Sequence, residues 1–265
     1  MIKGLVSVGA ILILWGVTLT AGPLEVYVGG GPSAASLDEI NAVILQFNTL
    51  IELLNETFEL LPAVEGTVEP LDQMGSGIAI HAGERAWLSD RLGLGGTLEV
   101  FHSVTSTAGT YESSETSEIS IALACTAVGL MLGGRYEFLD AGVVLSIDLG
   151  IGYTYASFSR AITFQVPPEY PDAIAGLPPE GESRYSGFAP AVEAGLTLSF
   201  PIMDWFKVGS SLSYRLLTLA GMVDSEDNAL DLDGNNTTEK VDLGGITVCF
   251  TFSILIDLSR EGGKE

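Results

Sequence analysis

The sequence is poor in charged residues and poorer still in basic ones. Charged residues make up 17% of the chain, whereas a soluble domain has about a quarter. Eleven Lys and Arg stand against 34 Asp and Glu, which gives a formal net charge of −23. Nucleic-acid binding needs a basic surface, so this composition argues against it. With 47% hydrophobic residues, the chain favours a protein whose surface is partly covered by something other than water.

Cysteine and catalytic motifs are scarce as well. Cys125 and Cys249 are too few for a disulfide scaffold, and we place them on opposite faces of well-separated strands, which predicts free thiols. His102 and Ser103 are adjacent in a strand and point to opposite faces, while His81 is expected to be a structural histidine in the interior. No metal-ligand spacing, phosphate loop or nucleophile elbow occurs. The sequence therefore predicts no enzyme, no metal site and no cofactor.

Long apolar runs are absent from the chain except at its N-terminus. A membrane-spanning helix needs roughly 18–20 apolar residues. The N-terminal run follows Lys3, extends from Leu5 to Leu19 and ends in small residues. This is the layout of a secretory signal peptide, and we predict one over residues 1–21. An uncleaved anchor helix is the alternative interpretation.

What the sequence does contain is period-two alternation. In the segment 143–156 every odd residue is apolar or aromatic, and six of the seven even residues are small or polar, which predicts a strand with one apolar face. Similar segments predict eight strands in all, in the ranges 24–28, 76–87, 92–104, 118–136, 143–156, 188–200, 206–216 and 246–256. The alternation slips near Ala127 and Val128, which suggests a β-bulge.

Short and long connections alternate along the chain. Residues 88–91, 139–142 and 202–205 form short turns, each with an Asp, whereas long loops cover about 32–75, 107–117, 165–187 and 223–240. This is the arrangement of a transmembrane β-barrel. Aromatic residues flank the short turns and predict one aromatic girdle, made of Trp87, Tyr136, Phe138, Phe200, Trp205 and Phe206. A second group lies toward the long loops and would form the opposite girdle: Tyr153, Tyr155, Phe158, Tyr185, Phe188 and Tyr214.

This architecture resembles the small outer-membrane barrels, namely the OmpA transmembrane domain, OmpX and OmpW. In the last strand, Gly245, Val248 and Phe250 match part of the assembly signal of these families. The resemblance implies an eight-stranded antiparallel transmembrane β-barrel over residues 22–257, with a polar tail at 258–265. It also implies a location in the outer membrane of a diderm bacterium, with outer-membrane lipid and the barrel-assembly machinery as partners.

The orientation of the faces decides the function class. Gly, Ala and Ser on the polar faces suit a crowded lumen, so we expect the apolar faces to meet lipid, rather than to be buried as in a soluble barrel. Charges on the inward faces should pair, because unpaired buried ions cost several kcal/mol. The predicted lumen ion-pair network is Glu25, Arg85, Glu99, Arg135, Asp148, Glu193, Lys207 and Arg215. A gated pore is the alternative to a purely structural network.

One helical insertion interrupts the strands within residues 33–66. Ser36 and Glu39 form a capping box, and apolar residues then recur at spacings of three and four, which predicts an amphipathic helix. Asn41, Asn48 and Asn55 repeat at intervals of seven. We expect the helix to act as a lid or plug through Ile40, Ile44, Phe47, Ile51, Leu54 and Phe58. Lying at the membrane surface or pairing with another chain are the alternatives.

The long loops are acidic, which indicates a solvated surface or, as the sharper hypothesis, binding of divalent cations. Two function classes follow. The first is a structural or surface-interaction barrel with a charged, packed lumen. The second, by resemblance to OmpW, is passage of small apolar molecules across the outer membrane. The sequence specifies neither a permeant molecule nor an oligomeric state.

Overall fold

The computed structural model describes residues 22–60, 65–112, 116–140, 142–165, 180–232 and 238–257. The predicted signal peptide at 1–21 and the predicted polar tail at 258–265 lie outside these ranges. So do parts of the acidic loops, in the ranges 113–115, 166–179 and 233–237.

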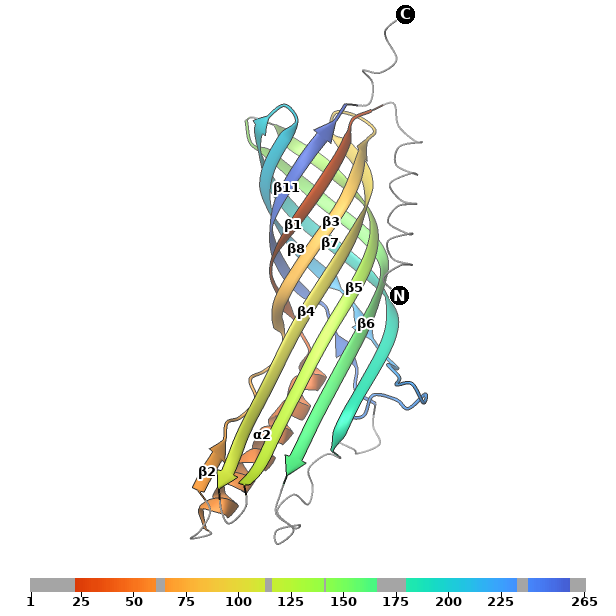
Figure 1. Cartoon of the computed structure of the whole chain (residues 1–265). Coiled ribbons are helices and arrows are strands. Elements are labelled where there is room, and N and C mark those ends of the chain that lie inside the picture. Colours follow the sequence, from red (N-terminus) through yellow and green to blue (C-terminus); the bar gives the residue numbers. More distant parts are fainter. Residues whose placement is uncertain are drawn as a thin grey trace, which may run out of the picture.

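Eight antiparallel strands close into a barrel, which confirms the fold predicted from the alternation (Figure 1). The ring consists of β1 (Leu24–Ala35), β3 (Ser76–Trp87), β4 (Leu92–Glu112), β5 (Thr116–Asp140), β6 (Val144–Gln165), β7 (Gly181–Met203), β8 (Phe206–Leu216) and β11 (Gly245–Ile256). β1 pairs with both β3 and β11, and the pairing of β4 with β5 completes the ring. The other strands are short: β2 (Glu65–Val68) pairs with the end of β4, and β9 (Thr218–Leu219) pairs with β10 (Val241–Asp242).

Each barrel strand turns its larger apolar side chains outward. On β6, Leu149, Ile151 and Tyr153 are 61%, 66% and 68% exposed, whereas Ser146 and Thr154 on the inward face are buried. In a soluble barrel, the hydrophobic effect would bury these large side chains in the interior. The barrel therefore has the surface of a transmembrane β-barrel, apolar outside and polar inside.

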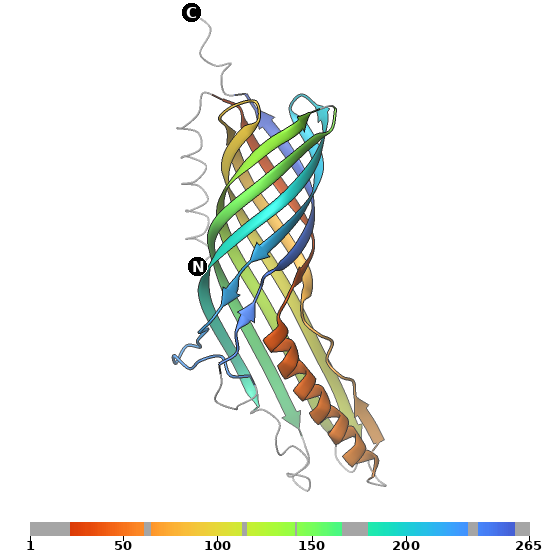
Figure 2. The same ribbon diagram turned by 180° about the vertical axis from the view of Figure 1, so that it is seen from behind.

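The strands differ greatly in length. β4, β5, β6 and β7 have 21, 25, 22 and 23 residues, whereas β1, β3, β8 and β11 have 11 or 12. The long strands therefore continue past the barrel as a curved four-stranded sheet (Figures 1 and 2). We call this sheet the extension. Helix α2 (Asp38–Glu59) lies along its concave side. No helix among the described residues is long and apolar enough to cross a membrane.

The predicted β-bulge near Ala127 is wrong. β5 pairs with β4 in unbroken register from Tyr136 to Thr116, and the odd residues from Ile119 to Arg135 face inward. The apolar set changes face because the surroundings change. In the barrel the outward side meets lipid, whereas in the extension the inward side meets α2. Cys125 and Cys249 are free, as predicted, but both are buried on inward faces rather than opposite ones.

Candidate functional site

The lumen contains a cluster of four charged side chains from β1, β3, β5 and β6. Glu25 and Arg85 are direct cross-strand partners on β1 and β3, and their side chains pair at 3.0 Å. Arg135 and Asp148 are partners on β5 and β6, and they pair at 2.7 Å. Arg85 also reaches Asp148 at 3.4 Å, across the lumen. Two cross-strand pairs from opposite walls are thus joined into one network that spans the interior.

A second cluster lies nearer the extension. Arg215 and Glu193 are cross-strand partners on β8 and β7, and they pair at 3.2 Å. Arg215 also pairs with Glu99 from β4, on the other side of the lumen. Lys207 joins neither cluster, because it pairs at 3.4 Å with Glu137, a residue that the sequence analysis missed. The structure thus brings together seven of the eight predicted residues in two clusters and places Lys207 apart.

Between the clusters lies a polar cavity of about 100 Å³. Its lining includes Tyr27, His81, Thr97, Ser213 and Thr251. His81 faces inward, with Nε2 at 3.5 Å from the Thr251 hydroxyl. Sites for drug-sized ligands are about 300–1,000 Å³, so this cavity accommodates a few water molecules rather than an organic ligand.

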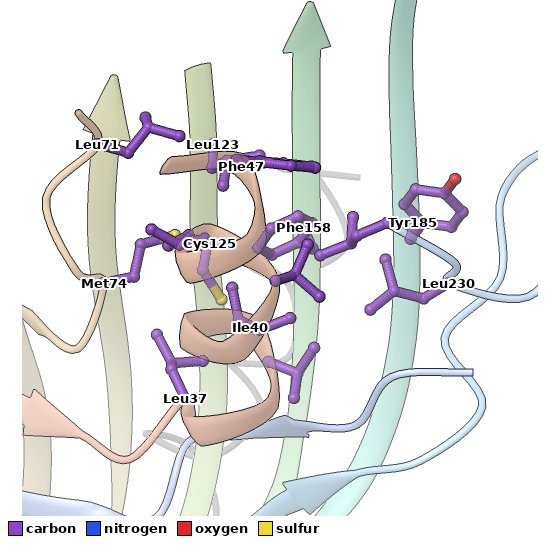
Figure 3. Packing of buried hydrophobic residues seen from close by; sticks show 14 of the residues in the cluster. Leu37, Ile40, Phe47, Leu71, Met74, Leu123, Cys125, Phe158, Tyr185 and Leu230 are labelled. Carbon is purple, nitrogen blue, oxygen red and sulfur yellow. The ribbon is translucent and has the colours of Figure 1, made fainter. Parts of the chain in front are cut away.

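Helix α2 packs into the extension through the apolar stripe that the sequence predicted. Its buried residues contact the inward side chains of β5 and β6, including Leu123, Cys125 and Phe158 (Figure 3). The buried residues of the helix are Ile40, Val43, Ile44, Phe47, Ile51, Leu54 and Phe58. Six of these seven are the predicted lid or plug residues. The helix therefore forms the core of the extension together with these strand residues, and it lies beyond the long-loop end of the barrel, in the lower part of Figure 2.

The predicted capping box is not formed. The N-cap is Leu37, which has no side-chain oxygen and adopts a left-handed conformation with φ 45°. Ser36 donates instead to the Asp38 carboxylate at 3.1 Å, and the Glu39 carboxylate accepts the Lys240 backbone N–H at 2.5 Å. Leu37 is fully buried and its N–H donates to the Asp242 carbonyl. Tertiary contacts thus replace the local cap.

The asparagine repeat binds an extended segment, residues 65–75, which we call the strap. Asn41, Asn48 and Asn55 each make two hydrogen bonds to one strap residue, donating to its carbonyl and accepting its N–H. The distances are 2.6 and 2.8 Å for Asn41 with Met74, 2.9 and 2.7 Å for Asn48 with Leu71, and 2.9 and 3.0 Å for Asn55 with Val68. The three side chains form a ladder that recognises backbone alone.

The spacing of this ladder follows from helix geometry. Seven helical residues rise about 10.5 Å, and three residues of extended chain cover about 10 Å. A heptad of asparagines therefore matches every third strap residue. Val68, Leu71 and Met74 are accordingly buried, while the two residues between each pair are exposed. A period of three is typical of the polyproline II conformation rather than of a strand.

Strand β4 binds the strap from its other side. The hydroxyls of Thr107 and Thr105 donate to the carbonyls of Glu69 and Asp72 at 2.6 and 2.9 Å, and the Ser103 hydroxyl donates at 2.8 Å to the carbonyl of Ser76, the first residue after the strap. The strap is thus fixed between helix and sheet through its main chain. The asparagine interval is visible in the sequence, but it does not by itself predict the strap. The spacing of three between the apolar residues Val68, Leu71 and Met74 is the sequence signal that points to this segment.

Five of the six predicted girdle residues at the short turns lie on the outer surface. Tyr136, Phe138, Phe200 and Trp205 are 41% to 53% exposed, and Phe206 is half-buried beside Trp205. The prediction that Trp87 belongs to the girdle is wrong, because Trp87 is an odd residue of β3, faces the lumen and is buried. Its ring lies 5.5 Å from the Lys207 ammonium, which explains why an aromatic residue occupies this inward position.

The aromatic group toward the long loops is split between the two faces. Tyr153, Tyr155, Phe188 and Tyr214 face outward, and the rings of Tyr155 and Phe188 lie 4.9 Å apart. Phe158 and Tyr185 instead face inward and belong to the buried cluster that also contains the apolar residues of α2. They belong to the core of the extension, so the predicted second girdle has four members rather than six.

Among the described residues there is no group of three or more His, Cys, Asp or Glu side chains that could hold a metal ion. Binding of divalent cations by the acidic loops stays a prediction. Asp224 forms a local turn. Its carboxylate accepts hydrogen bonds from the Asn228 side chain and from the backbone N–H groups of Asn228 and Glu226. The Asn228 amide and these backbone donors hold the pKa of Asp224 below its usual value.

No protein-family model and no curated protein matches the chain. Among solved structures, it is similar to Ail, the attachment invasion locus protein of Yersinia pestis, with 13% identity and a TM-score of 0.39 over 88% of this chain and 97% of Ail. It is also similar to the N-terminal β-barrel domain of Pseudomonas aeruginosa OprF, with 10% identity and a TM-score of 0.34 over 89% and 98%.

A third similar structure is the outer membrane protease OmpT from Escherichia coli, with 11% identity and a TM-score of 0.33 over 89% of this chain and 96% of that one. Similarities at these scores do not support an inference about function, and the protease activity belongs to OmpT. The fold implied by the sequence resemblance, a small outer-membrane β-barrel, is the fold of the chain. The expectation that the chain is not an enzyme stays a prediction.

Proposed function

We propose that the protein is a closed outer-membrane β-barrel that anchors a rigid surface structure, the extension with its helix and strap. The observation that carries this proposal is the lumen. Arg85 and Arg215 each pair with acidic residues from two different strands, and the cavity between the clusters is about 100 Å³. Such a lumen suits a structural support better than a conduit.

The height of the apolar surface supports a location in the membrane. On β6 the outward apolar residues run from Leu145 to Tyr155. Ten residue steps cover about 33 Å along a strand, which is about 25 Å of height at a tilt of roughly 40°. That height matches the apolar band of outer-membrane barrels. In this proposal residues 1–21 direct export, and the barrel-assembly machinery recognises β11.

The long strands would then leave the membrane on the outer side. Beyond Tyr155, β6 continues for ten more residue steps to Gln165, which is about 33 Å along the strand. Its inward side chains there pack against α2 instead of lining a channel. A structural or surface-interaction role follows from this geometry, because a large part of the fold is a packed projection outside the bilayer.

Conductance in planar bilayers tests the proposal. Helix α2 and the two ion-pair clusters would each close the lumen, so we expect no steady current from the wild-type protein. We expect current steps from a variant that lacks residues 36–62 and also carries Arg85→Ala and Arg215→Ala, because each arginine joins the opposite walls in one of the two clusters. The matched control combines the same deletion with Arg91→Ala, because Arg91 is exposed in a short turn. Heat-modifiable gel migration checks that each variant is a folded barrel.

Steady current through the wild-type protein would contradict the closed lumen and favour a gated pore. The alternative function, passage of small apolar molecules, has a separate readout. Uptake of a fluorescent apolar probe by vesicles that contain the wild-type protein, at a rate above that of empty vesicles, would support transport instead.

A further inference from the structure

Helix α2 also has apolar side chains on the side opposite its buried stripe. Leu45, Leu53 and the C-cap Leu60 are 65%, 59% and 83% exposed. Each is two positions from a buried residue of the helix, which is a rotation of about 200°. The helix lies in front of the extension sheet in Figure 2, and no described segment covers it there. A surface helix normally has polar residues opposite its core face, so this second apolar face indicates a contact surface.

Two smaller residues join the leucines into a continuous stripe. Ala42 and Thr49 are exposed on the same side of the helix, at spacings of three and four from Leu45. The Thr49 hydroxyl donates to the Leu45 carbonyl at 3.0 Å, so it needs no partner from outside the helix. We call Ala42, Leu45, Thr49, Leu53 and Leu60 the outer stripe, which runs about 27 Å along the helix. In the proposed orientation the extension projects into water, where an apolar surface of this kind favours binding of a partner.

The charge around the outer stripe is of one sign. Residues 36–75, which include the helix and the strap, contain eight acidic residues and no Lys or Arg, and all eight are exposed. Glu52 lies one turn from Asn48, which binds the strap, and Glu56 lies one turn further along. These two carboxylates therefore border the outer stripe on the strap side, where the strap adds three of the eight acidic residues. Two copies of this surface would repel each other.

We propose that the outer stripe docks a basic amphipathic helix of another protein. Apolar side chains of the partner would cover the leucines, and its Lys or Arg residues would lie along the acidic border. The spacing of three and four in the outer stripe suits a second helix, because such rows pack ridge into groove. About 18 helical residues would cover its length. Charge complementarity favours this occupant over a second copy of the chain.

The inference names the kind of partner for the surface-interaction role, and it rests on the proposed function because it needs the extension to stand outside the bilayer. Binding of a designed peptide to the refolded full chain in phosphatidylcholine nanodiscs tests it. The probe is a fluorescein-labelled helix of three heptads, with Leu at the stripe positions and Lys beside them. Fluorescence anisotropy should show saturable binding above that to empty nanodiscs. A peptide with Glu in place of every Lys should bind at least about tenfold more weakly, because like charges repel at the border.

Substitution of the leucines tests the apolar part of the surface. Leu45→Gln with Leu53→Gln should weaken binding of the Lys peptide at least about tenfold, because it removes apolar area that the partner would bury. The matched control is Val104→Gln, since Val104 is 60% exposed on the outward side of β4, away from α2. The control should bind like the wild type. Unchanged protection of α2 from hydrogen exchange checks that the helix stays docked in the double variant.

Substitution of the border carboxylates tests the charged part. Glu52→Gln with Glu56→Gln should weaken binding about fivefold, because exposed ion pairs at the edge of an interface each contribute little. Glu180→Gln with Glu182→Gln is the matched control, since both residues are exposed at the start of β7. It changes the net charge equally and should leave the affinity as in the wild type, which separates a local border from the attraction of the whole acidic chain.

Wild-type affinity in the variant with both leucines replaced would overturn the proposal, and so would equal binding of the Lys and Glu peptides. Self-association of the wild-type chain that the two Leu substitutions abolish, measured by analytical ultracentrifugation, would identify a second copy as the occupant and would overturn it as well. Heat-modifiable gel migration reports insertion of the barrel separately. Failure to insert would refute the barrel function itself, whereas an inserted chain that does not bind the peptide refutes only the docking surface.

Discussion

Replacing Asn48 with Ala should loosen the strap without unfolding the barrel. Asn48 makes two hydrogen bonds, of 2.9 and 2.7 Å, to the backbone of Leu71, and Leu71 is 4% exposed. Each such bond contributes about 1 kcal/mol net, and an abandoned buried backbone group costs about 1–3 kcal/mol. We therefore expect the docking of the strap to lose about 2–4 kcal/mol. Ala is a better helix former than Asn, so α2 itself should not weaken.

Hydrogen exchange followed by mass spectrometry measures this loss directly. A destabilisation of about 2 kcal/mol accelerates exchange through local opening roughly 30-fold. The acceleration should be confined to peptides from residues 65–75, while β1 and β11 keep their protection. Gln46→Ala is the matched control, since Gln46 is an exposed residue of the same helix. Unchanged exchange of the strap in Asn48→Ala would refute the argument that side-chain amides hold this segment.

Two further predictions concern the lumen and the girdle. Arg135→Ala should lower the free energy of unfolding in urea by about 3 kcal/mol, because the buried Asp148 carboxylate loses its closest cation. The double variant Arg135→Leu with Asp148→Leu should lose less stability, because it removes both charges. Equal losses in the two variants would contradict this coupling. Brominated lipids should quench the fluorescence of Trp205 but not that of Trp87, since Trp205 is 53% exposed and Trp87 is 8% exposed. In proteins cut after Ala21, the Trp87→Phe variant reports on Trp205 and the Trp205→Phe variant reports on Trp87. Quenching of Trp87 would place it on the lipid side.

Alternation predicted the barrel well because most of each short strand has one environment on each side. Odd residues of 143–156 meet lipid and even residues meet the lumen, so one rule describes the segment. The same rule placed Glu25, Arg85, Arg135 and Asp148 on inward faces. Their pairing then needed only the register of neighbouring strands, which sets cross-strand partners about 5 Å apart.

The rule failed where a strand crosses from one environment to another. β5 keeps its register, but its apolar residues change from the outward to the inward side once α2 replaces the lumen. Reading that change as a bulge treated a tertiary contact as a local irregularity. Phe158 and Tyr185 were misplaced for the same reason. An aromatic residue near a strand end suits a membrane interface and a packed core equally well, and only the position of the helix decides between them.

The strap and the cap of the helix lay beyond sequence rules for another reason. Val68, Leu71 and Met74 repeat at a period that belongs neither to a helix nor to a strand, so neither template selects them. Leu37 is an improbable N-cap on local grounds. It occupies that position because its side chain is buried in the core of the extension and its N–H bonds to the Asp242 carbonyl.

The match between seven helical and three extended residues gives the projection a unit of construction. One such unit consists of seven residues of α2 and three residues of the strap, with matching residue pairs in the hairpins. Adding one unit would lengthen the extension by about 10 Å. Each added unit would contain one asparagine that makes the same two hydrogen bonds to the strap backbone. The barrel in the bilayer would not change. Duplication of this unit could therefore change the height of the extension above the membrane in increments of one unit.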